Sequence, residues 1–386
     1  MKRYAIIGAG AAGCFCAIEL KRRCPSDVVE IFEAGRRPLA KVAVTGGGRC
    51  NLTNSFASVR SLEEIYPRGH HLMKRILREF GNRETMEWFE KEGVRLTVQD
   101  DGCVFPASQD AMQIVRTLTS LISDLGIKIH CNARIANAAD LVRDFDAVVI
   151  TTGGGTASIV DGLGIATEPQ IPSLFTFNIA EKSLCSLMGT VVENASVSLT
   201  GTKMRASGPL LITDWGLSGP AILKLSSYGA RYLAGCNYRS GISIRWADGF
   251  EPLDSHKMIC STPPDGLSSR LWKHIISRSG LREDIRWSEA GSRGINKLRE
   301  AVLNDTYTIT GKCRFKDEFV TCGGVSLDAV HPGTLRARSD GRFAFAGEVL
   351  DIDAITGGFN LQAAWSTGWV AAKGLAEAAE GQMDLE

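Results

Sequence analysis

Residues 4–23 read YAIIGAGAAGCFCAIELKRR, a short apolar run followed by three spaced glycines and a helix-forming stretch. The apolar run predicts a buried strand, and the residues after the third glycine predict a helix. Gly8, Gly10 and Gly13 match the G-x-G-x-x-G turn that places the pyrophosphate of a dinucleotide at a helix N-terminus. The first glycine permits the tight turn, the second lets the backbone approach the pyrophosphate, and the third lets helix and strand pack closely. The stretch therefore predicts a nucleotide-binding α/β domain.

A second apolar run, VVEIF at 28–32, predicts the next strand and is followed directly by Glu33. Glu33 comes twenty residues after Gly13, where the fingerprint has an acid that accepts hydrogen bonds from the adenosine ribose. The carboxylate disfavours NADP at this site because it would face the 2′-phosphate, although Arg36 and Arg37 could partly offset that repulsion. The fingerprint by itself leaves NAD and FAD open.

Two later segments favour FAD. The first, DAVVITTGGGTA at 146–157, is an apolar strand that runs into a glycine-rich turn. The second, at 340–379, predicts a strand, then Gly347 and Glu348, and then a long alanine-rich helix opened by a glycine pair. We expect Gly347 and Glu348 to meet the ribityl and pyrophosphate, and the helix start to direct N–H groups at the electron-rich end of a flavin ring. A return of the chain to its nucleotide domain suits a ligand longer than NAD, so the sequence predicts FAD.

The stretch VTGGGRCNLTNS at 44–55 has no apolar periodicity, and it predicts neither a core helix nor a core strand. It follows the second predicted strand, where the chain would pass along the pyrophosphate towards the flavin. Its three glycines would let the backbone lie against the cofactor. Arg49 and Asn51 would supply donors near the phosphates or the ring.

The composition fits a soluble globular protein, with 386 residues, 44% hydrophobic and 23% charged. A net charge of +1 gives no electrostatic footprint for nucleic acid or an anionic membrane, so a small-molecule substrate is the expected partner and nucleic acid is disfavoured. The basic stretch RGHHLMKRILR at 68–78 predicts a solvated helix face. Eleven cysteines show neither disulfide nor metal-ligand spacing and favour free thiols in a reducing cytosol.

Lys2 and Arg3, followed by an apolar stretch, resemble the start of a signal peptide. The fixed glycine spacing and the lack of a cleavage site argue against that interpretation. The apolar run is also too short and too broken by glycine for a membrane span. We therefore expect a cytoplasmic protein without membrane association, and the oligomeric state stays open.

The chain resembles the aminoacetone oxidase family of FAD-dependent flavoproteins in three stretches, GGGRCNLTN at 46–54, GPLLITDWGLSGPAIL at 208–223 and GEVLDIDAITGGFNLQAAWSTG at 347–368. The resemblance covers nearly the whole chain. It implies an FAD-binding Rossmann-like α/β domain interrupted by an insertion with an antiparallel β-barrel-like part and a small helical lobe. Phe359 departs from a frequent tyrosine, and Trp215 stands in a turn that often holds histidine or glycine, which leaves the substrate open.

These motifs define a predicted FAD site. Its members are Gly8, Gly10, Ala12, Gly13, Glu33, Ala34, Lys41, Gly47, Gly48, Arg49, Cys50, Asn51, Ala133, Thr152, Gly153, Gly154, Gly347, Glu348, Gly358, Phe359, Asn360, Leu361 and Gln362. No His-Asp or carboxylate pair stands out as a general acid or base, so the sequence predicts no catalytic residue and no metal site.

Cys50 lies beside the predicted flavin. It could be a redox partner or a covalent attachment point, but a buried, space-filling residue is the simpler interpretation. It has no resolving cysteine in CxxC or CxxxxC spacing, which excludes disulfide-reductase chemistry by that route.

The rest of the N-terminal region predicts alternating elements. The segment 72–94 predicts two helices and 111–126 a third, while 94–98, 103–107 and 127–131 predict strands. This alternation is expected to continue the parallel sheet.

The sequence changes in character after about residue 170. Short β-like runs at 190–199, 209–213 and 241–246 predict an antiparallel insertion, and 265–280 and 294–305 predict helices of a small lobe. The predicted domains are 1–170 and 321–386 for FAD binding, 171–250 for the inserted β domain, 251–305 for the helical lobe and 306–320 for the return strand of the insertion.

An insertion over a nucleotide domain usually forms the second wall of the active site. Trp215, Leu217, Ser218 and Pro220 are candidates to line that wall, and an ordinary insertion turn is the alternative.

The sequence thus predicts an FAD-dependent oxidoreductase, with hydride transfer to the flavin N5 from a small organic substrate or from NAD(P)H. No second glycine fingerprint follows a strand after residue 150. NAD(P)H would therefore dock transiently, or the substrate would reduce the flavin and oxygen would reoxidise it, as aminoacetone oxidation requires. The alternatives are an RNA-modifying flavoprotein, which the low net charge disfavours, and a non-catalytic redox-sensing flavin-binding protein.

Overall fold

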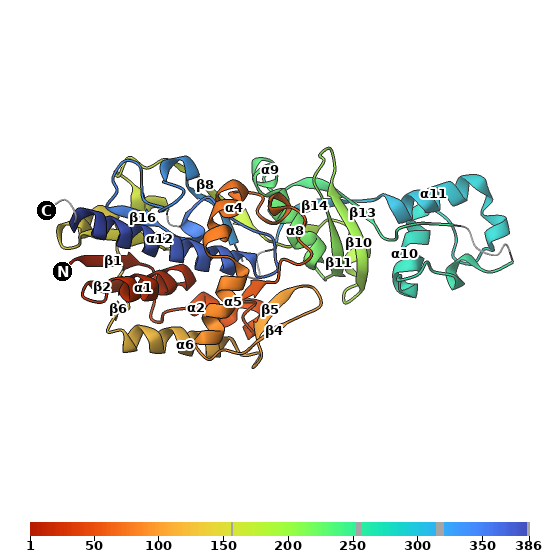
Figure 1. Ribbon diagram of the computed structural model, residues 1–386. Helices are drawn as coiled ribbons and strands as arrows, with labels where there is room; N and C mark the ends of the chain where they lie inside the picture. The colour runs from red at the N-terminus through yellow and green to blue at the C-terminus, as the bar shows by residue number, and fades with distance from the viewer. Residues whose placement is uncertain (156, 252–255, 314–319, 384–386) are drawn as a thin grey trace. The chain divides into compact units, whose positions relative to one another are not determined.

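A computed structural model describes residues 1–155, 157–251, 256–313 and 320–383 (Figure 1). The chain divides into two compact units. Unit 1 comprises Met1–Ile171 and Val320–Glu386, and unit 2 comprises Pro172–Phe319. The first and last parts of the sequence therefore fold together, and the middle is one long insertion. The finer division at residues 171–250, 251–305 and 306–320 stays a prediction.

Unit 1 is built on a five-stranded parallel sheet in the order β16-β7-β1-β2-β6. Its strands are β1 (Arg3–Ile7), β2 (Val28–Phe32), β6 (Lys128–His130), β7 (Ala147–Ile150) and β16 (Phe343–Phe345). The central strand β1 is buried from Tyr4 to Ile7, as expected for a parallel strand that is covered on both faces. Because the strands are parallel, the carboxyl ends of β1, β2 and β7 lie at one edge of the sheet, where α/β proteins bind ligands.

Helices α1 (Ala11–Arg23) and α12 (Phe359–Met383) lie side by side, although they come from opposite ends of the chain (Figure 1). Residues 12–20 of α1 are buried, so this helix is enclosed by the rest of unit 1. The remaining helices of the unit are α2 (Ala40–Gly48), α3 (Leu62–Ile65), α4 (His70–Glu79), α5 (Asn82–Lys91) and α6 (Ala111–Asp124). No helix in the described ranges has the length and hydropathy that crossing a bilayer would require.

A second, antiparallel sheet corrects one expectation. The strands predicted at 94–98 and 103–107 do not continue the parallel sheet. They form β4 (Leu96–Val98) and β5 (Cys103–Pro106), which pair antiparallel in the order β3-β5-β4 with β3 (Thr53–Asn54). The reason is the short connection between β4 and β5, because parallel strands need a crossover of a dozen or more residues.

Unit 2 contains a closed antiparallel barrel in the order β10-β11-β12-β9-β14-β13. The strands are β9 (Phe177–Ile179), β10 (Val191–Leu199), β11 (Arg205–Ile212), β12 (Gly216–Ser218), β13 (Ser240–Arg245) and β14 (Asp305–Lys312). The helices are α7 (Lys182–Cys185), α8 (Pro220–Tyr228), α9 (Ala230–Gly235), α10 (Ser269–Ser279) and α11 (Gly291–Leu303). Outside both main sheets, β8 (Thr167–Ser173) pairs with β15 (Val320–Val325).

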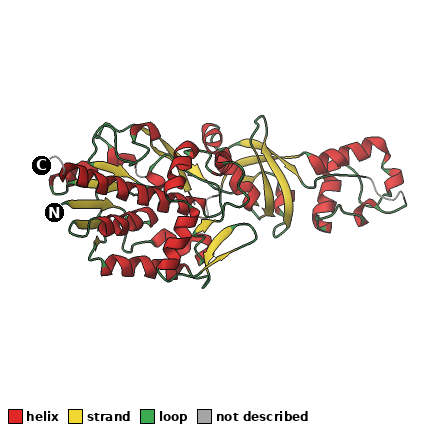
Figure 2. Ribbon diagram, in the orientation of Figure 1, coloured by secondary structure: helices red, strands yellow, loops and turns green. Residues whose placement is uncertain are grey.

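The barrel and the helices α10 and α11 occupy different ends of unit 2 (Figure 2). They nevertheless share one hydrophobic core, which runs from barrel residues such as Leu217 and Ile244 to Trp272 and Leu298 on the helices. The predicted fold class, a Rossmann-like domain with an antiparallel barrel-like insertion and a helical part, is confirmed.

A buried carboxylate joins α10 to the barrel. Asp305, at the start of β14, is 3% exposed. It accepts hydrogen bonds from Arg278 Nη2 at 2.8 Å and Nε at 3.0 Å, and from Trp246 Nε1 at 3.0 Å. The Tyr307 hydroxyl also donates to it, and burial raises the pKa of that hydroxyl, which keeps it protonated. One carboxylate therefore accepts from four donor atoms on three side chains.

We predict that Asp305→Ala destabilises the protein by about 3–5 kcal/mol, because it leaves a guanidinium and two buried donors without their acceptor. Chemical unfolding followed by circular dichroism measures this loss. The matched control is Asp284→Ala, because Asp284 is also paired with an arginine but its side chain is 63% exposed. The control should change stability by less than about 1 kcal/mol. Equal losses in the two variants would contradict the assignment.

Candidate cofactor site

The turn between β1 and α1 forms the first part of the site. A Cβ atom on Gly13 would lie 2.0 Å from the Gly8 carbonyl oxygen and 2.4 Å from Thr151 Oγ1, so no larger residue fits there. The Thr151 hydroxyl lies 2.9 Å from the carbonyl oxygens of Ile7 and Gly8 and ties β7 to this turn. Gly10 has no neighbouring atom within 4 Å of its Cβ position, and no side chain caps α1. The turn therefore leaves open space at an uncapped helix N-terminus, which favours an anion.

Glu33 closes the same turn from the end of β2. Its Oε2 accepts a hydrogen bond from the Ala9 N–H at 2.8 Å, and its Oε1 accepts one from the Gly35 N–H at 2.6 Å. The Ala133 N–H donates to the Glu33 carbonyl at 2.8 Å. The carboxylate is thus fixed at the edge of the sheet, and each oxygen keeps acceptor capacity for a ribose hydroxyl. Ala34 follows directly and is exposed.

The glycine run at 46–48 is a left-handed turn at the end of α2. The chain leaves helical geometry at Thr45, and the three glycines have φ of 57°, 70° and 85°. Glycine is needed there because other residues are strained at positive φ. Arg49 places its guanidinium 4.5 Å from the centre of the Phe105 ring and donates from Nε to the Gly46 carbonyl at 3.2 Å. Arg49 is therefore held by the turn itself.

The start of α12 is fastened to residues 51–54. At Gly358, φ is +88° and a Cβ atom would lie 2.3 Å from the Thr53 carbonyl oxygen. With its amide oriented to satisfy both neighbours, Asn51 accepts from the Gly358 N–H at 3.2 Å and donates to the Thr53 carbonyl at 3.0 Å. Asn54 donates to the Gly357 carbonyl at 3.0 Å. A segment near the N-terminus thus sets where α12 begins.

Several side chains of this helix turn face inward. Gln362 is fully buried, and it bonds to Thr53 Oγ1, to Thr85 Oγ1 at 2.9 Å and to Ser366 Oγ at 2.8 Å. Phe359 is also buried, and its carbonyl accepts from the Tyr66 hydroxyl at 3.0 Å. Only the backbone of these residues is therefore available to a ligand.

Asn360, from the same turn, is committed to the preceding loop. Its amide exchanges two hydrogen bonds of 2.9 Å with the backbone of Ala354. The loop and the helix start are therefore held as one piece, and Leu361, which follows Asn360 in α12, is half-buried.

Glu348 brings three further segments together. It lies in the 3-10 turn η6 (Gly347–Val349), and its Oε1 accepts from the Thr321 N–H at 2.7 Å. Its Oε2 lies 3.4 Å from Lys41 Nζ on α2. Gly153 and Gly154, which follow Thr152 after β7, lie against the same carboxylate. Gly347 lies against Ala12 of α1. The structure therefore brings together several residues of the predicted FAD site, namely Lys41, 152–154 and 347–348.

The arrangement fits FAD. Two helices, α1 and α12, begin at this edge of unit 1, and neither has an acidic residue in its first turn. Glu33 offers acceptors for a ribose, and the glycine turns at 10 and 46–48 leave their Cβ positions mostly open. A long molecule with an anionic centre and an electron-rich ring matches these two helix ends. Contact between FAD and the individual residues stays a prediction.

Sequence reasoning missed residues that hold the site together. Thr53, Asn54, Tyr66, Thr85 and Thr321 make the contacts just described. Thr53 and Asn54 are part of the quoted GGGRCNLTN motif, and Thr321 precedes a Cys-Gly-Gly sequence, so a signal existed for these three. Tyr66 and Thr85 carry no such signal.

Unit 2 corrects one candidate for the substrate wall. Leu217 on β12 is fully buried in the barrel core, so its side chain does not line a surface pocket. The Trp215 carbonyl accepts from the Ile179 N–H at 3.0 Å, and Pro220 is the first residue of α8. Ser218 is half-buried. A role for Trp215, Ser218 or Pro220 towards a substrate stays a prediction.

Comparisons with known proteins match almost the whole chain. A family model described as "HI0933-like protein Rossmann domain" matches residues 2–374. The 3-dehydro-bile acid delta(4,6)-reductase of Clostridium scindens is 27% identical over 416 residues, covering 98% of this chain and 100% of the relative. The ribosomal RNA dihydrouridine synthase of Haemophilus influenzae is 26% identical over 399 residues, covering 95% and 96%. A solved quinol-fumarate reductase with menaquinol molecules is 13% identical with a TM-score of 0.46, covering 99% of this chain and 72% of that one.

We predict that Gly10→Ala and Gly13→Ala fail for different reasons. The methyl group at position 10 meets no protein atom, so the apoprotein should keep its stability while losing FAD, because the methyl occupies the space for the pyrophosphate. The methyl at position 13 collides with backbone, so stability should fall by about 1–3 kcal/mol or more. Flavin absorbance of the purified protein and denaturant unfolding of the apoprotein separate the two effects. Normal FAD content in Gly10→Ala would contradict the assignment.

The Cys50 thiol is fully buried, and burial raises its pKa to about 12, partly opposed by a hydrogen bond from Thr45. We predict that iodoacetamide at about pH 8 leaves Cys50 unmodified in the folded protein, because the thiolate is the nucleophile. Half-buried Cys313 is the internal control, and peptide mass spectrometry locates the label. Modification of Cys50 without unfolding would contradict this.

The raised pKa of Cys50 makes the stability of the folded protein depend on pH. The unfolded chain releases this proton near the ordinary pKa of 9.0, whereas the folded chain holds it up to about 12. The contribution of the buried thiol to stability is therefore complete below pH 9 and is lost as the pH rises towards 12. Cys50→Ala should make this alkaline loss of stability smaller in denaturant titrations.

Proposed function

We propose a specific reaction for this chain, which belongs to the HI0933-like protein Rossmann domain family and is an FAD-dependent oxidoreductase. The enzyme reduces a carbon–carbon double bond that is conjugated to a carbonyl group, and NAD(P)H is the electron source. We propose that the residues of the predicted site bind FAD. Phe359, Asn360 and Gln362 would do so through backbone atoms, because their side chains are engaged within the protein. The expected compartment is the cytoplasm.

The proposal rests on the type of double bond that the names of two relatives imply. One is named as a delta(4,6)-reductase of a 3-dehydro-bile acid, and the other as a synthase of dihydrouridine in ribosomal RNA. A 3-oxo group conjugated with the double bonds, and the ring carbonyl of uracil beside its double bond, both make the bond electrophilic. Saturating the bond next to the carbonyl adds a hydride to the β carbon and a proton to the α carbon. In a delta(4,6) system, the second conjugated bond accepts the hydride at the δ carbon by the same polarity. This shared chemistry carries the proposal.

Bound FAD would supply two-electron chemistry, accepting a hydride from NAD(P)H and delivering it to the substrate. The protein's own residues set up the environment. The Asn51 and Asn54 side chains hold the glycine pair before α12, so the positive end of this helix has one fixed position. That end favours the negative charge that accumulates near it during reduction.

The polar side chains beneath the helix start are satisfied within the protein. Gln362 donates to Thr85 Oγ1 and Ser366 Oγ, and Ser366 donates to the Phe80 carbonyl. A low local dielectric strengthens the electrostatic effect of a helix end. The thiol of Cys50 stays neutral and out of reach, so covalent attachment of the flavin is not part of the proposal.

A second candidate is oxidation of a small amine with oxygen as the acceptor. The motifs GGGRCNLTN and TGGFNLQ, which resemble those of the aminoacetone oxidase family, favour it. The two candidates differ in which compound reduces the flavin and which one reoxidises it.

Anaerobic rapid mixing of the FAD-loaded protein decides between them. Under the proposal, NADH or NADPH bleaches the flavin absorbance, and a conjugated enone or a uridine-containing RNA then restores it without oxygen. If aminoacetone bleaches the flavin, NAD(P)H does not, and only oxygen restores the colour, the second candidate replaces the first. Bleaching by NAD(P)H with reoxidation only by oxygen would also contradict double-bond reduction of the substrates tested.

A further inference from the structure

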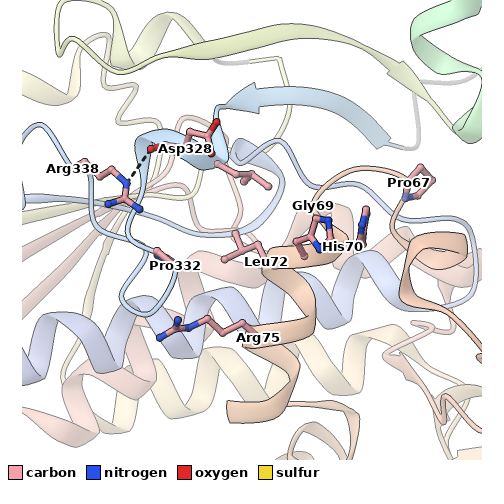
Figure 3. A pocket seen from close by; sticks show the side chains of 10 residues that line it. Pro67, Gly69, His70, Leu72, Arg75, Asp328, Pro332 and Arg338 are labelled. Atoms are coloured by element: carbon pink, nitrogen blue, oxygen red, sulfur yellow. Dashed lines mark hydrogen bonds between the residues drawn. The ribbon is translucent and has the colours of Figure 1, made fainter.

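We propose that a pocket on unit 1, separate from the cofactor site, binds the phosphate group of a nucleotide. The pocket has a volume of about 450 Å³, within the usual range for small-ligand sites. It lies between the start of α4 and the segment around the 3-10 turn η5 (Leu327–Ala329) (Figure 3). The lining residues are Pro67, Gly69, His70, His71, Leu72, Arg75, Leu327, Asp328, Pro332 and Arg338. None of them belongs to the candidate cofactor site.

Two permanent cations from distant parts of the chain line this pocket. Arg75 comes from α4 and Arg338 from the segment before β16, and both are exposed. Within the described ranges, neither guanidinium forms an ion pair with a carboxylate. Guanidinium groups bind phosphate oxygens in a bidentate geometry, so two of them without carboxylate partners favour a phosphate ligand.

Hydrogen bonds hold the Arg338 guanidinium. Its Nε donates to the Asp328 carbonyl at 3.0 Å (Figure 3). Its Nη1 lies 3.4 Å from His331 Nδ1. Arg75 lies against Gly333, where a Cβ atom would come within 2.9 Å of Nη2. The absence of a side chain at 333 therefore leaves room for the arginine. Such ordering lowers the entropy cost of binding a ligand.

The helix start adds to the positive potential. Gly69 precedes α4 with no side-chain cap, and the first turn of this ten-residue helix has no acidic residue. His70 and His71 open the helix, with ring centres 4.1 Å apart. Asp328 is the one acidic residue of the lining, and its carboxylate points away from Arg75 (Figure 3). The lining of the pocket therefore carries a net positive charge, although the whole chain has a net charge of only +1.

The remaining lining favours a nucleotide over inorganic phosphate. Pro67, Leu72, Leu327 and Pro332 supply apolar surface for a base or sugar. The stretch 68–78, expected from sequence to be a solvated helix face, therefore has one part that forms the wall of a pocket. The nucleotide could be free or part of an RNA strand, because both carry the same phosphate chemistry.

Isothermal titration of the FAD-saturated protein tests the proposal, since bound FAD blocks the adenosine subsite of the cofactor. The probes are 5′-AMP, adenosine and a short single-stranded RNA. We expect 5′-AMP to bind at least roughly ten-fold more tightly than adenosine, because only the nucleotide meets the two arginines. The double variant Arg75→Gln with Arg338→Gln should remove this preference. The matched control Arg78→Gln removes an exposed charge from the same helix, outside the pocket lining, and should keep it.

The RNA arm identifies the source of the phosphate. RNA binding that 5′-AMP displaces and the double variant loses assigns the pocket to RNA, whereas binding of 5′-AMP alone assigns it to a free nucleotide. The proposal is overturned if 5′-AMP binds no better than adenosine, or if Arg78→Gln weakens binding as much as the double variant does. FAD content should stay unchanged in the double variant, and flavin bleaching by NAD(P)H is measured on the unaltered protein, so failure of this proposal and failure of the proposed function are distinguishable.

Discussion

The attachment of the first turn of α12 to residues 51–54 is the constraint on which unit 1 depends. Gly358 approaches the Thr53 carbonyl so closely that no side chain fits, and Asn51 and Asn54 bond to the backbone of the glycine pair. These contacts join segments about 300 residues apart in sequence. Because α12 also packs along α1, the two ends of the chain form one nucleotide domain and the insertion leaves and returns without interrupting it.

The buried polar groups make this attachment specific. Gln362 is fully buried and satisfied by Thr53, Thr85 and Ser366, so a shift of the helix by one residue would leave a buried amide without partners. Apolar packing alone would tolerate such a shift more readily. In unit 2, Asp305 acts in the same way for α10 and the barrel. In each unit, a completed polar network fixes the position of a helix that the hydrophobic core only holds in place.

Charge in this protein is arranged locally. The whole chain is nearly neutral, yet two helices of unit 1 have first turns without acidic residues, and two arginines without carboxylate partners in the described part of the chain line the pocket beside α4. A net charge therefore says little about anion binding at such sites. Two relatives of similar identity to this chain are named for different substrates, a bile acid and ribosomal RNA.

The sequence by itself determined the fold class and the local turn of the candidate cofactor site, where glycine or an acid is needed at fixed spacing. Gly8, Gly10, Gly13 and Glu33 were predictable because local backbone geometry allows few alternatives there. The antiparallel pairing of β4 and β5, the burial of Leu217, and the contacts of Tyr66 and Thr85 were not predictable. Only the tertiary structure decided them, because they depend on which distant segments meet, and a single sequence carries no local signal for such encounters.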